Sequence, residues 1–87
     1  MRLLIAEDEL WLRKRLVSTI DWSSYGISEV YEAEDGSSAI ELLESEQADD
    51  IDVVLMDMRM PGMDGIETTK IIRTKNGKCM EVPIIAM

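Results

Sequence analysis

The sequence predicts an α/β fold in which a parallel sheet carries helices on both faces. Short apolar runs of strand length alternate with segments of helical periodicity along the 87 residues. The third apolar run, from Val53 to Met56, shows no alternation of apolar and polar residues, which is typical of a strand covered on both faces. A chain of this length forms one small domain.

The first strand and the first helix are predicted over residues 2–6 and 10–20. RLLIA at 2–6 is an apolar run of strand length, and it stops at the acidic triplet EDE. Residues 10–20 then repeat apolar side chains at the spacing of an amphipathic helix, namely Leu12, Leu16, Val17 and Ile20. The basic run of this segment is interpreted as a solvated helix face; it consists of Arg13, Lys14 and Arg15.

The second strand and the second helix are predicted over residues 27–33 and 36–46. The turn residues of DWSSYG, at 21–26, separate them from the first helix. ISEVYEA at 27–33 alternates in part, as a strand does. Asp35 is a good N-cap for the helix that follows, because its side chain can accept a hydrogen bond from a backbone N–H of the first turn.

Two further strands and one helix complete the expected order. DVVLMD at 52–57 predicts the third strand, GIETTKIIRT at 65–74 the third helix, and PIIAM at 83–87 a fourth strand. The resulting order is β-α-β-α-β-α-β. Such alternation predicts a parallel sheet with right-handed crossovers.

Acidic residues stand at the ends of two predicted strands. Glu7 and Asp8 follow the first strand, and Asp57 ends the third. The carboxyl ends of parallel strands meet at one edge of the sheet, where open α/β sheets bind ligands, so these side chains converge if the two strands are neighbours. Glu9 is instead expected to face solvent or to cap the first helix.

Three carboxylates in one place repel one another, and a cation would neutralise them. Ligands that are all oxygen favour a hard ion, Mg²⁺ above all. An acid beside such an ion can also act as a nucleophile and become an aspartyl phosphate. The sequence therefore predicts a Mg²⁺ site with phosphoryl-transfer chemistry at this edge of the sheet.

Composition excludes several classes of function. The chain has no histidine and a single cysteine, Cys79, which removes Ser-His-Asp and Cys-His catalysis, His-ligated zinc and any internal disulfide. A formal net charge of -9 disfavours direct nucleic-acid binding by this segment. No apolar run reaches the length of a membrane span and no signal-peptide pattern opens the chain, so we expect a cytoplasmic protein without membrane contact.

Three stretches, LLIAEDE, VVLMDMRMPGMDGIE and VPIIAM, resemble the receiver domain of two-component response regulators, and the resemblance runs along the whole chain. It implies a flavodoxin-like (CheY-like) fold and phosphoryl transfer from a histidine kinase or phosphotransfer protein. By motif match Asp57 looks like the phosphoacceptor, Asp8 like a direct Mg²⁺ ligand, and Glu7 like an acid that acts through a metal-bound water. Arg59 matches the position that offers its backbone carbonyl to the metal.

Residues near these acids receive structural interpretations. Pro61, Gly62 and Gly65 are expected to shape the loop after Asp57, with Gly65 permitting a backbone angle that other residues resist. Trp11 is expected to pack against the protein, with a role as a reporter on the pocket as the alternative.

The chain departs from the family after the fourth strand. Complete receivers have a fifth strand and two more helices, together with a Ser or Thr and a Lys at the phosphoryl site, so residues 1–87 are expected to form a partial receiver domain. The fourth strand would then leave an apolar edge at Ile84 and Ile85, which favours a homodimer or a domain-swapped dimer.

Three classes of function remain. The favoured one is a phosphoacceptor of phosphorelay signal transduction, not an enzyme, which regulates transcription through an output domain outside this chain. An aspartyl-phosphate phosphatase is disfavoured, because such enzymes carry a second Asp two residues after the nucleophile, where this chain has Arg59. The third class is a pseudo-receiver that acts by protein contact only. For the output, DWSSYGI resembles regulators with an AraC-type DNA-binding domain and PIIAM is closer to receivers of hybrid sensor kinases.

Overall fold

The computed structural model describes residues 1–44, 51–58, 64–74 and 82–86 of the chain. The strands are β1 (Arg2–Ala6), β2 (Glu29–Ala33), β3 (Ile51–Met56) and β4 (Ile84–Ala86). The helices are α1 (Leu10–Thr19), the 3₁₀ helix η1 (Trp22–Tyr25), α2 (Gly36–Glu44) and α3 (Gly65–Thr74). None of these described helices has the length and apolar character of a membrane-spanning segment.

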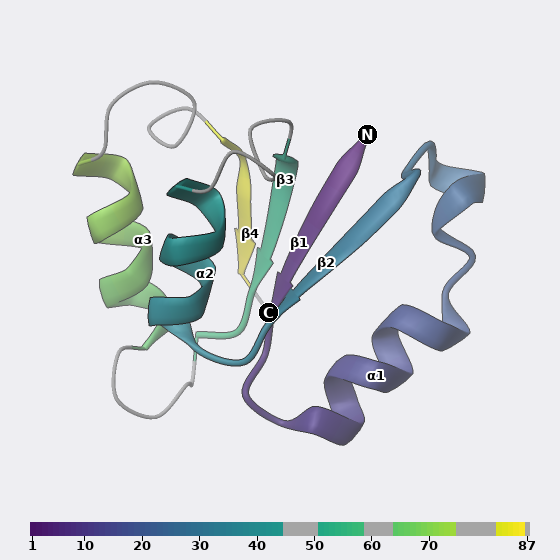
Figure 1. Cartoon of the computed structure of the whole chain (residues 1–87), viewed down its shortest axis with the longest axis horizontal. Coiled ribbons are helices and arrows are strands. Elements are labelled where there is room, and N and C mark those ends of the chain that lie inside the picture. The colour runs from purple at the N-terminus through teal and green to yellow at the C-terminus, as the bar shows by residue number, and fades with distance from the viewer. Residues whose placement is uncertain (45–50, 59–63, 75–81, 87) are drawn as a thin grey trace.

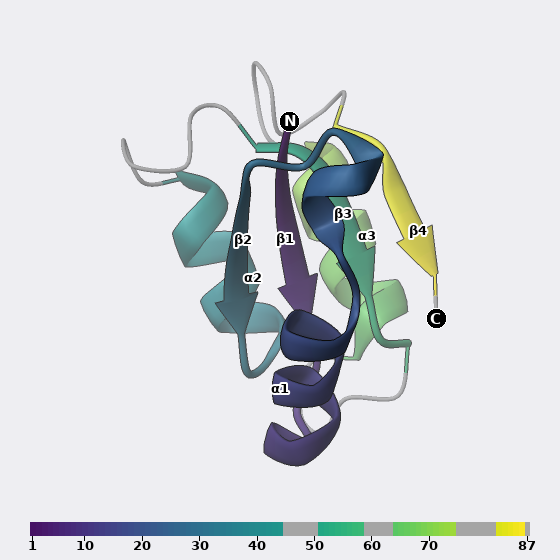
Figure 2. The same ribbon diagram turned by 90° about the vertical axis from the view of Figure 1, so that its right-hand side faces the viewer.

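The four strands form one parallel sheet in the order β2-β1-β3-β4 (Figure 2), which confirms the predicted fold class. The chain passes from β1 to β2 on one side and then returns to place β3 on the other side of β1. The direction of strand addition therefore reverses between β1 and β3, and open α/β sheets bind ligands at such a switch point. Ala6 pairs with Met56 at the ends of these strands, so the residues after both strands leave the sheet side by side.

Helices lie on both faces of the sheet, with α2 and α3 on one face and α1 on the other (Figure 1). Successive side chains of a strand point to opposite faces, so each strand contributes to both layers. The core beneath α2 and α3 includes Leu4, Ala6, Ala39, Leu43, Val54, Met56 and Ile72. The core beneath α1 contains Leu3, Ile5 and Ile27 as its buried members.

β3 is covered less completely than its unbroken apolar sequence predicts. Val54 and Met56 are buried on the face of α2 and α3. Val53 and Leu55 are half-buried and pack against the core beneath α1. A helix is about 10 Å wide and adjacent strands lie about 4.8 Å apart, so α1 alone covers about two strands of this face. The prediction of full cover is thus right for one face of β3 and wrong for the other within the described residues.

The segment between α1 and β2, expected as a loop with turn residues at 21–26, contains the short 3₁₀ helix η1. The indole N–H of Trp22 in η1 donates to the Leu16 carbonyl at 3.1 Å and so ties this turn to α1. Gly26 ends η1 with a φ of 80°, a left-handed angle that glycine adopts readily. β2 then begins at Glu29, later than the predicted start at residue 27.

Aspartate side chains cap the starts of α2 and α3. Asp35 Oδ1 accepts a hydrogen bond from the Ser38 N–H at 2.7 Å, which confirms the predicted N-cap. The hydrogen bonds from Ser38 also hold the pKa of Asp35 below its usual value. Asp64 Oδ1 accepts from the Glu67 N–H at 2.8 Å in the same way. Both helices therefore start at a defined residue on the edge of the sheet where the strands end.

Candidate functional site

Glu7 and Asp57 each follow a strand directly and remain hydrogen-bonded to the neighbouring strand. The Glu7 N–H donates to the Ala33 carbonyl of β2 at 3.0 Å, and the Asp57 N–H donates to the Ala6 carbonyl of β1 at 2.9 Å. The hydrogen-bond pattern of the sheet thus continues one residue past β1 and β3. Asp8 lies in the turn between β1 and α1.

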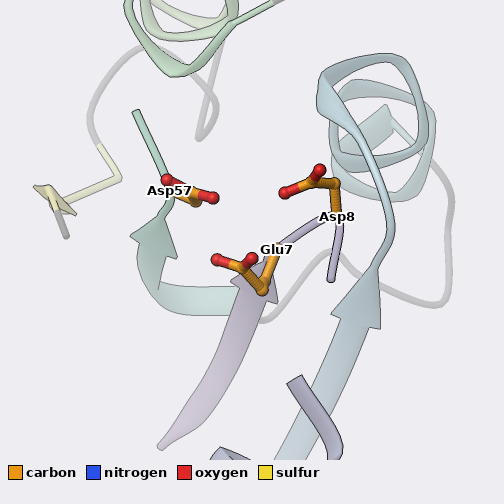
Figure 3. Close-up of side chains that lie close together, drawn as sticks. All are labelled: Glu7, Asp8 and Asp57. Carbon is orange, nitrogen blue, oxygen red and sulfur yellow. The ribbon is translucent and has the colours of Figure 1, made fainter. Parts of the chain in front are cut away.

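The side chains of these three acids point toward a common space (Figure 3). One carboxylate oxygen of each residue lies within 4.8 Å of those of the other two. Glu7 is buried, with 3% of its surface exposed, whereas Asp57 is half-buried and Asp8 is exposed. The structure therefore brings together the acids that the sequence singles out, and the cluster opens to solvent on the side of Asp8.

Burial, a hydrogen bond with Asp57 and the negative charges of Asp57 and Asp8 together raise the pKa of Glu7 from 4.5 to about 7, with burial as the largest cause. The Glu9 N–H donates to Glu7 Oε1 at 3.1 Å and partly opposes this shift. Near neutral pH, a large share of Glu7 therefore carries a proton, which reduces the repulsion within the cluster. A cation at the site would instead favour the ionised carboxylate.

The donor set fits a hard divalent cation such as Mg²⁺. All three side chains offer carboxylate oxygens, and the chain contains no histidine that would favour a softer metal. Mg²⁺ commonly takes one or two carboxylates and keeps several waters. Asp8 and Asp57 would then bind it directly, and Glu7 through a water. Arg59, the expected carbonyl ligand, lies outside the described residues, as do Pro61 and Gly62.

Gly65 is required for a reason other than the predicted one. Its φ is not positive, since Gly26 is the one positive-φ residue in the described part of the chain. A Cβ on Gly65 would lie 2.7 Å from Met58 Cα and closer still to the backbone carbonyl oxygen of Asp57. The start of α3 thus packs directly against the backbone that carries Asp57. The glycine permits this close approach, and the prediction of a special backbone angle is wrong.

Arg13 is buried, so the prediction that it belongs to a solvated basic face is wrong. Its surface is 9% exposed. Its Nη1 donates to the Glu7 backbone carbonyl at 2.7 Å, and its Nε donates to Glu32 Oε1 on β2 at 3.1 Å. Arg13 is therefore a residue of the candidate site that sequence reasoning missed.

A signal for the burial of Arg13 was present in the sequence. Arg13 precedes Leu16, Val17 and Ile20 by three, four and seven residues, and this spacing places all four on one face of a helix. Leu12, which the sequence analysis assigned to the apolar face, is exposed instead. Helical periodicity alone thus favoured Arg13 over Leu12 as an inward position.

Glu9 and Trp11 face solvent near the acids. Glu9 occupies the N-cap position of α1 without a side-chain capping hydrogen bond, so of the two expectations for it solvent exposure is correct. Trp11 is 81% exposed, which makes the expected packing role wrong. Its use as a reporter on the pocket stays a prediction.

The sequence profile of the response regulator receiver domain matches residues 3–87. The chemotaxis protein CheY1 of Helicobacter pylori is 35% identical over 85 residues, which cover 98% of this chain and 64% of that protein. The CAI-1 autoinducer sensor kinase/phosphatase CqsS of Vibrio cholerae is 34% identical over 84 residues, which cover 97% of this chain and 11% of that protein.

Solved structures show the same fold. The crystal structure of a two component transcriptional regulator AraC from Clostridium phytofermentans superposes with a TM-score of 0.83 at 32% identity, covering 100% of this chain and 63% of that one. This chain therefore spans less than two thirds of the length of each of these three proteins.

Proposed function

The chain belongs to the response regulator receiver domain family, and from this premise we propose that Asp57 accepts a phosphoryl group from a histidine kinase or phosphotransfer protein. One observation carries the proposal. The carboxylates of Glu7, Asp8 and Asp57 converge at the switch point of the sheet, with oxygen atoms within 4.8 Å of one another. The proposed phosphoacceptor and the candidate Mg²⁺ ligands therefore belong to one cluster of side chains.

In the proposed reaction, a carboxylate oxygen of Asp57 attacks the phosphorus of a phosphohistidine. The O–P bond forms as the P–N bond breaks, the electron pair leaves with the imidazole nitrogen, and Asp57 becomes an acyl phosphate. Bound Mg²⁺ would supply positive charge against the phosphoryl oxygens. The hydrogen bond from the Asp57 N–H to Ala6 and the close packing of Gly65 hold the nucleophile at the edge of the sheet.

We propose a signalling module and not an enzyme with an external substrate. An aspartyl-phosphate phosphatase would need a second acid two residues after Asp57, where the sequence has Arg59. A pseudo-receiver that acts by contact alone has no use for three carboxylates that repel one another. The negative charges of Asp57 and Asp8 contribute to the raised pKa of Glu7, which shows this repulsion. Metal binding separates the phosphoacceptor from the contact-only module, because a contact-only module has no need of Mg²⁺, and turnover of an external phosphoester would favour the phosphatase.

The proposed output is regulation of transcription by a domain outside this chain, in the cytoplasm. The DWSSYGI segment and the structural likeness to a two component transcriptional regulator AraC at 32% identity support this output. The likeness to a sensor kinase/phosphatase supports the rival, a receiver within a hybrid kinase. A DNA-binding domain in the same protein would favour the first output, and a kinase domain would favour the second.

A homodimer or a domain-swapped dimer is proposed as a further property of this chain. β4 pairs with β3 alone among the described strands, and its Ile85 is exposed. Sedimentation velocity over a range of protein concentrations would detect the dimer, and a monomer at every concentration would contradict it.

The phosphoacceptor proposal is tested by intact mass after incubation with acetyl phosphate, with Mg²⁺ or with EDTA. We expect one phosphoryl adduct in the presence of Mg²⁺, and none with EDTA or in Asp57→Asn. Asp64→Asn is the matched control, since it removes a nearby carboxylate while Asn still caps α3. An adduct that persists in Asp57→Asn, or no adduct in the unmodified chain, would contradict the proposal.

A further inference from the structure

We infer that Arg13 is a positioning residue of the acidic site. By holding the Glu7 backbone carbonyl, it fixes the peptide that joins Glu7 to Asp8 and thereby the placement of both carboxylates. The inference rests on the proposed function, because it concerns the residues that would bind Mg²⁺. It extends that function to a side chain that comes from α1 and contacts none of the reacting atoms.

The contact is short and buried. Arg13 Nη1 lies 2.7 Å from the Glu7 carbonyl oxygen, and the Arg13 side chain is almost fully enclosed. A buried charge is costly unless it is paired and hydrogen-bonded, and a buried ion pair adds little stability compared with apolar packing. An apolar residue would serve the inward face of α1 at lower cost, so the presence of arginine calls for a role beyond packing.

The backbone of Glu7 is fixed at both of its polar groups. Its N–H donates to the Ala33 carbonyl at 3.0 Å, and its carbonyl accepts from Arg13. Because the peptide unit is planar, holding the Glu7 carbonyl also sets the direction of the Asp8 N–H. Asp8 pairs with none of the described strands, since it lies in the turn beyond the sheet. The guanidinium therefore orients the backbone at the point where hydrogen bonding within the sheet ends.

Glu32 holds the guanidinium in place. Its Oε1 accepts from Arg13 Nε at 3.1 Å, and its Oε2 accepts from Lys14 Nζ at 3.0 Å. Glu32 belongs to β2 and stands in register with Ile5 of β1, next to the end of that strand. Arginine suits this position because its rigid fork can reach the carboxylate and the carbonyl together, whereas lysine offers a single nitrogen.

The positive charge of Arg13 and its positioning of Glu7 have opposite expected effects on Mg²⁺ binding. A guanidinium near a Mg²⁺ site repels the ion, so removal of the charge alone would tighten Mg²⁺ binding. Loss of positioning would weaken Mg²⁺ binding instead. If the role of Arg13 is purely structural, its removal would lower the stability of the fold and leave the Mg²⁺ affinity of the folded protein unchanged. The sign of the change therefore separates the three roles.

The test measures the dissociation constant for Mg²⁺ by titration calorimetry, at a temperature where circular dichroism shows each variant folded. In Arg13→Met, which keeps the alkyl stem, we expect Mg²⁺ binding to weaken about tenfold, as is typical when a group that orients a metal ligand is lost. Arg13→Lys retains one donor and should restore part of the affinity. Arg15→Met, on the exposed side of the same helix, removes an equal charge and should leave the affinity nearly unchanged.

A second readout follows the backbone directly. In the absence of metal, the amide resonance of Asp8 should shift in Arg13→Met while that of Asp57, bound to Ala6, does not. If Arg13→Met does not fold, Arg13→Lys and Glu32→Gln carry the same test with smaller expected changes. Unchanged or tighter Mg²⁺ binding in the folded variants would overturn the inference. Failure of the unmodified protein to bind Mg²⁺ would overturn the proposed function itself, so the two failures are distinct.

Discussion

β1 and β4 belong to one sheet and stand in opposite situations. β1 lies between β2 and β3, and its Leu4 and Ile5 have no exposed surface. β4 pairs with β3 alone in the described part of the chain, and its Ile85 is 55% exposed. The acids follow β1 and its neighbour β3, so the candidate site depends on the most deeply buried strand of the sheet. The site should therefore be sensitive to changes at β1 and tolerant of changes at β4.

The largest effect should come from the core of β1. Leu4→Ala removes a side chain with 0% exposure and should lower the free energy of unfolding by about 2–5 kcal/mol. Ile85→Ala in β4 should cost less than about 1 kcal/mol and leave the phosphoryl adduct in place. Urea denaturation of both variants measures the contrast. Equal costs, or loss of the adduct in Ile85→Ala, would show that β4 supports the site as much as β1 does.

The next effect concerns Glu7 at the end of β1 in the metal-free protein. Its pKa is raised from 4.5 to about 7, so the folded state binds this proton more tightly than the unfolded state does. The contribution of Glu7 to stability should be complete below pH 4.5 and should fall by about 1–3 kcal/mol as pH rises toward 7. The difference between the unmodified protein and Glu7→Gln in EDTA isolates the effect.

Exposed Glu41 of α2 provides the control for this pH dependence, because Glu41→Gln should leave the same curve unchanged. Mg²⁺ binding should also release a proton in this pH range, which calorimetry in buffers of different ionisation enthalpy can detect. A pH profile of Glu7→Gln that matches the unmodified protein would contradict the assignment to Glu7.

A pair of glycines separates loss of stability from damage to the site. Gly65→Ala places a methyl group against the backbone of Asp57 and Met58, and should cost about 1–3 kcal/mol and slow formation of the adduct. Gly26→Ala imposes strain at a φ of 80°, at a cost of about 1–2 kcal/mol, and should leave the adduct unchanged. Equal phosphorylation rates in the two folded variants would refute the role given to Gly65.

The smallest effect concerns the start of α3. Asp64→Ala removes the side-chain cap on the Glu67 N–H and should lower stability by about 1 kcal/mol. Asp64→Asn keeps an acceptor at the same place and should retain most of the stability. Thermal denaturation of both variants measures the difference, and an equal loss in the two would mean that charge, and not capping, matters at this position.

The fold class and the acidic cluster could be predicted because both follow from local patterns. Apolar runs indicate strands, and parallel topology brings the residues after β1 and β3 to one edge. Contacts between distant segments could not be predicted in this way. The face of α1 that carries Arg13 is visible in the sequence, but its partner Glu32 lies on another strand. The close approach of Gly65 to the backbone of Asp57 depends on how α3 packs against the end of β3, and no local sequence pattern predicts that packing.

Because Glu7 and Asp57 directly follow their strands, insertions and deletions should be tolerated differently in the strands and in the connections between them. Adjacent strands lie about 4.8 Å apart, so hydrogen bonding within the sheet sets the separation of the two acids. Insertions in the connections that precede β2 or β3 would leave that separation intact. The pairing of β1 with β3 is irregular at its start, where Arg2 pairs with Ile51 and Leu3 with Val53, and regular from there to Met56. One residue inserted in this regular part of β3 would turn Asp57 to the opposite face of the sheet. The connections are free to diverge in length, while the regularly paired parts of the two strands that carry the acids are not.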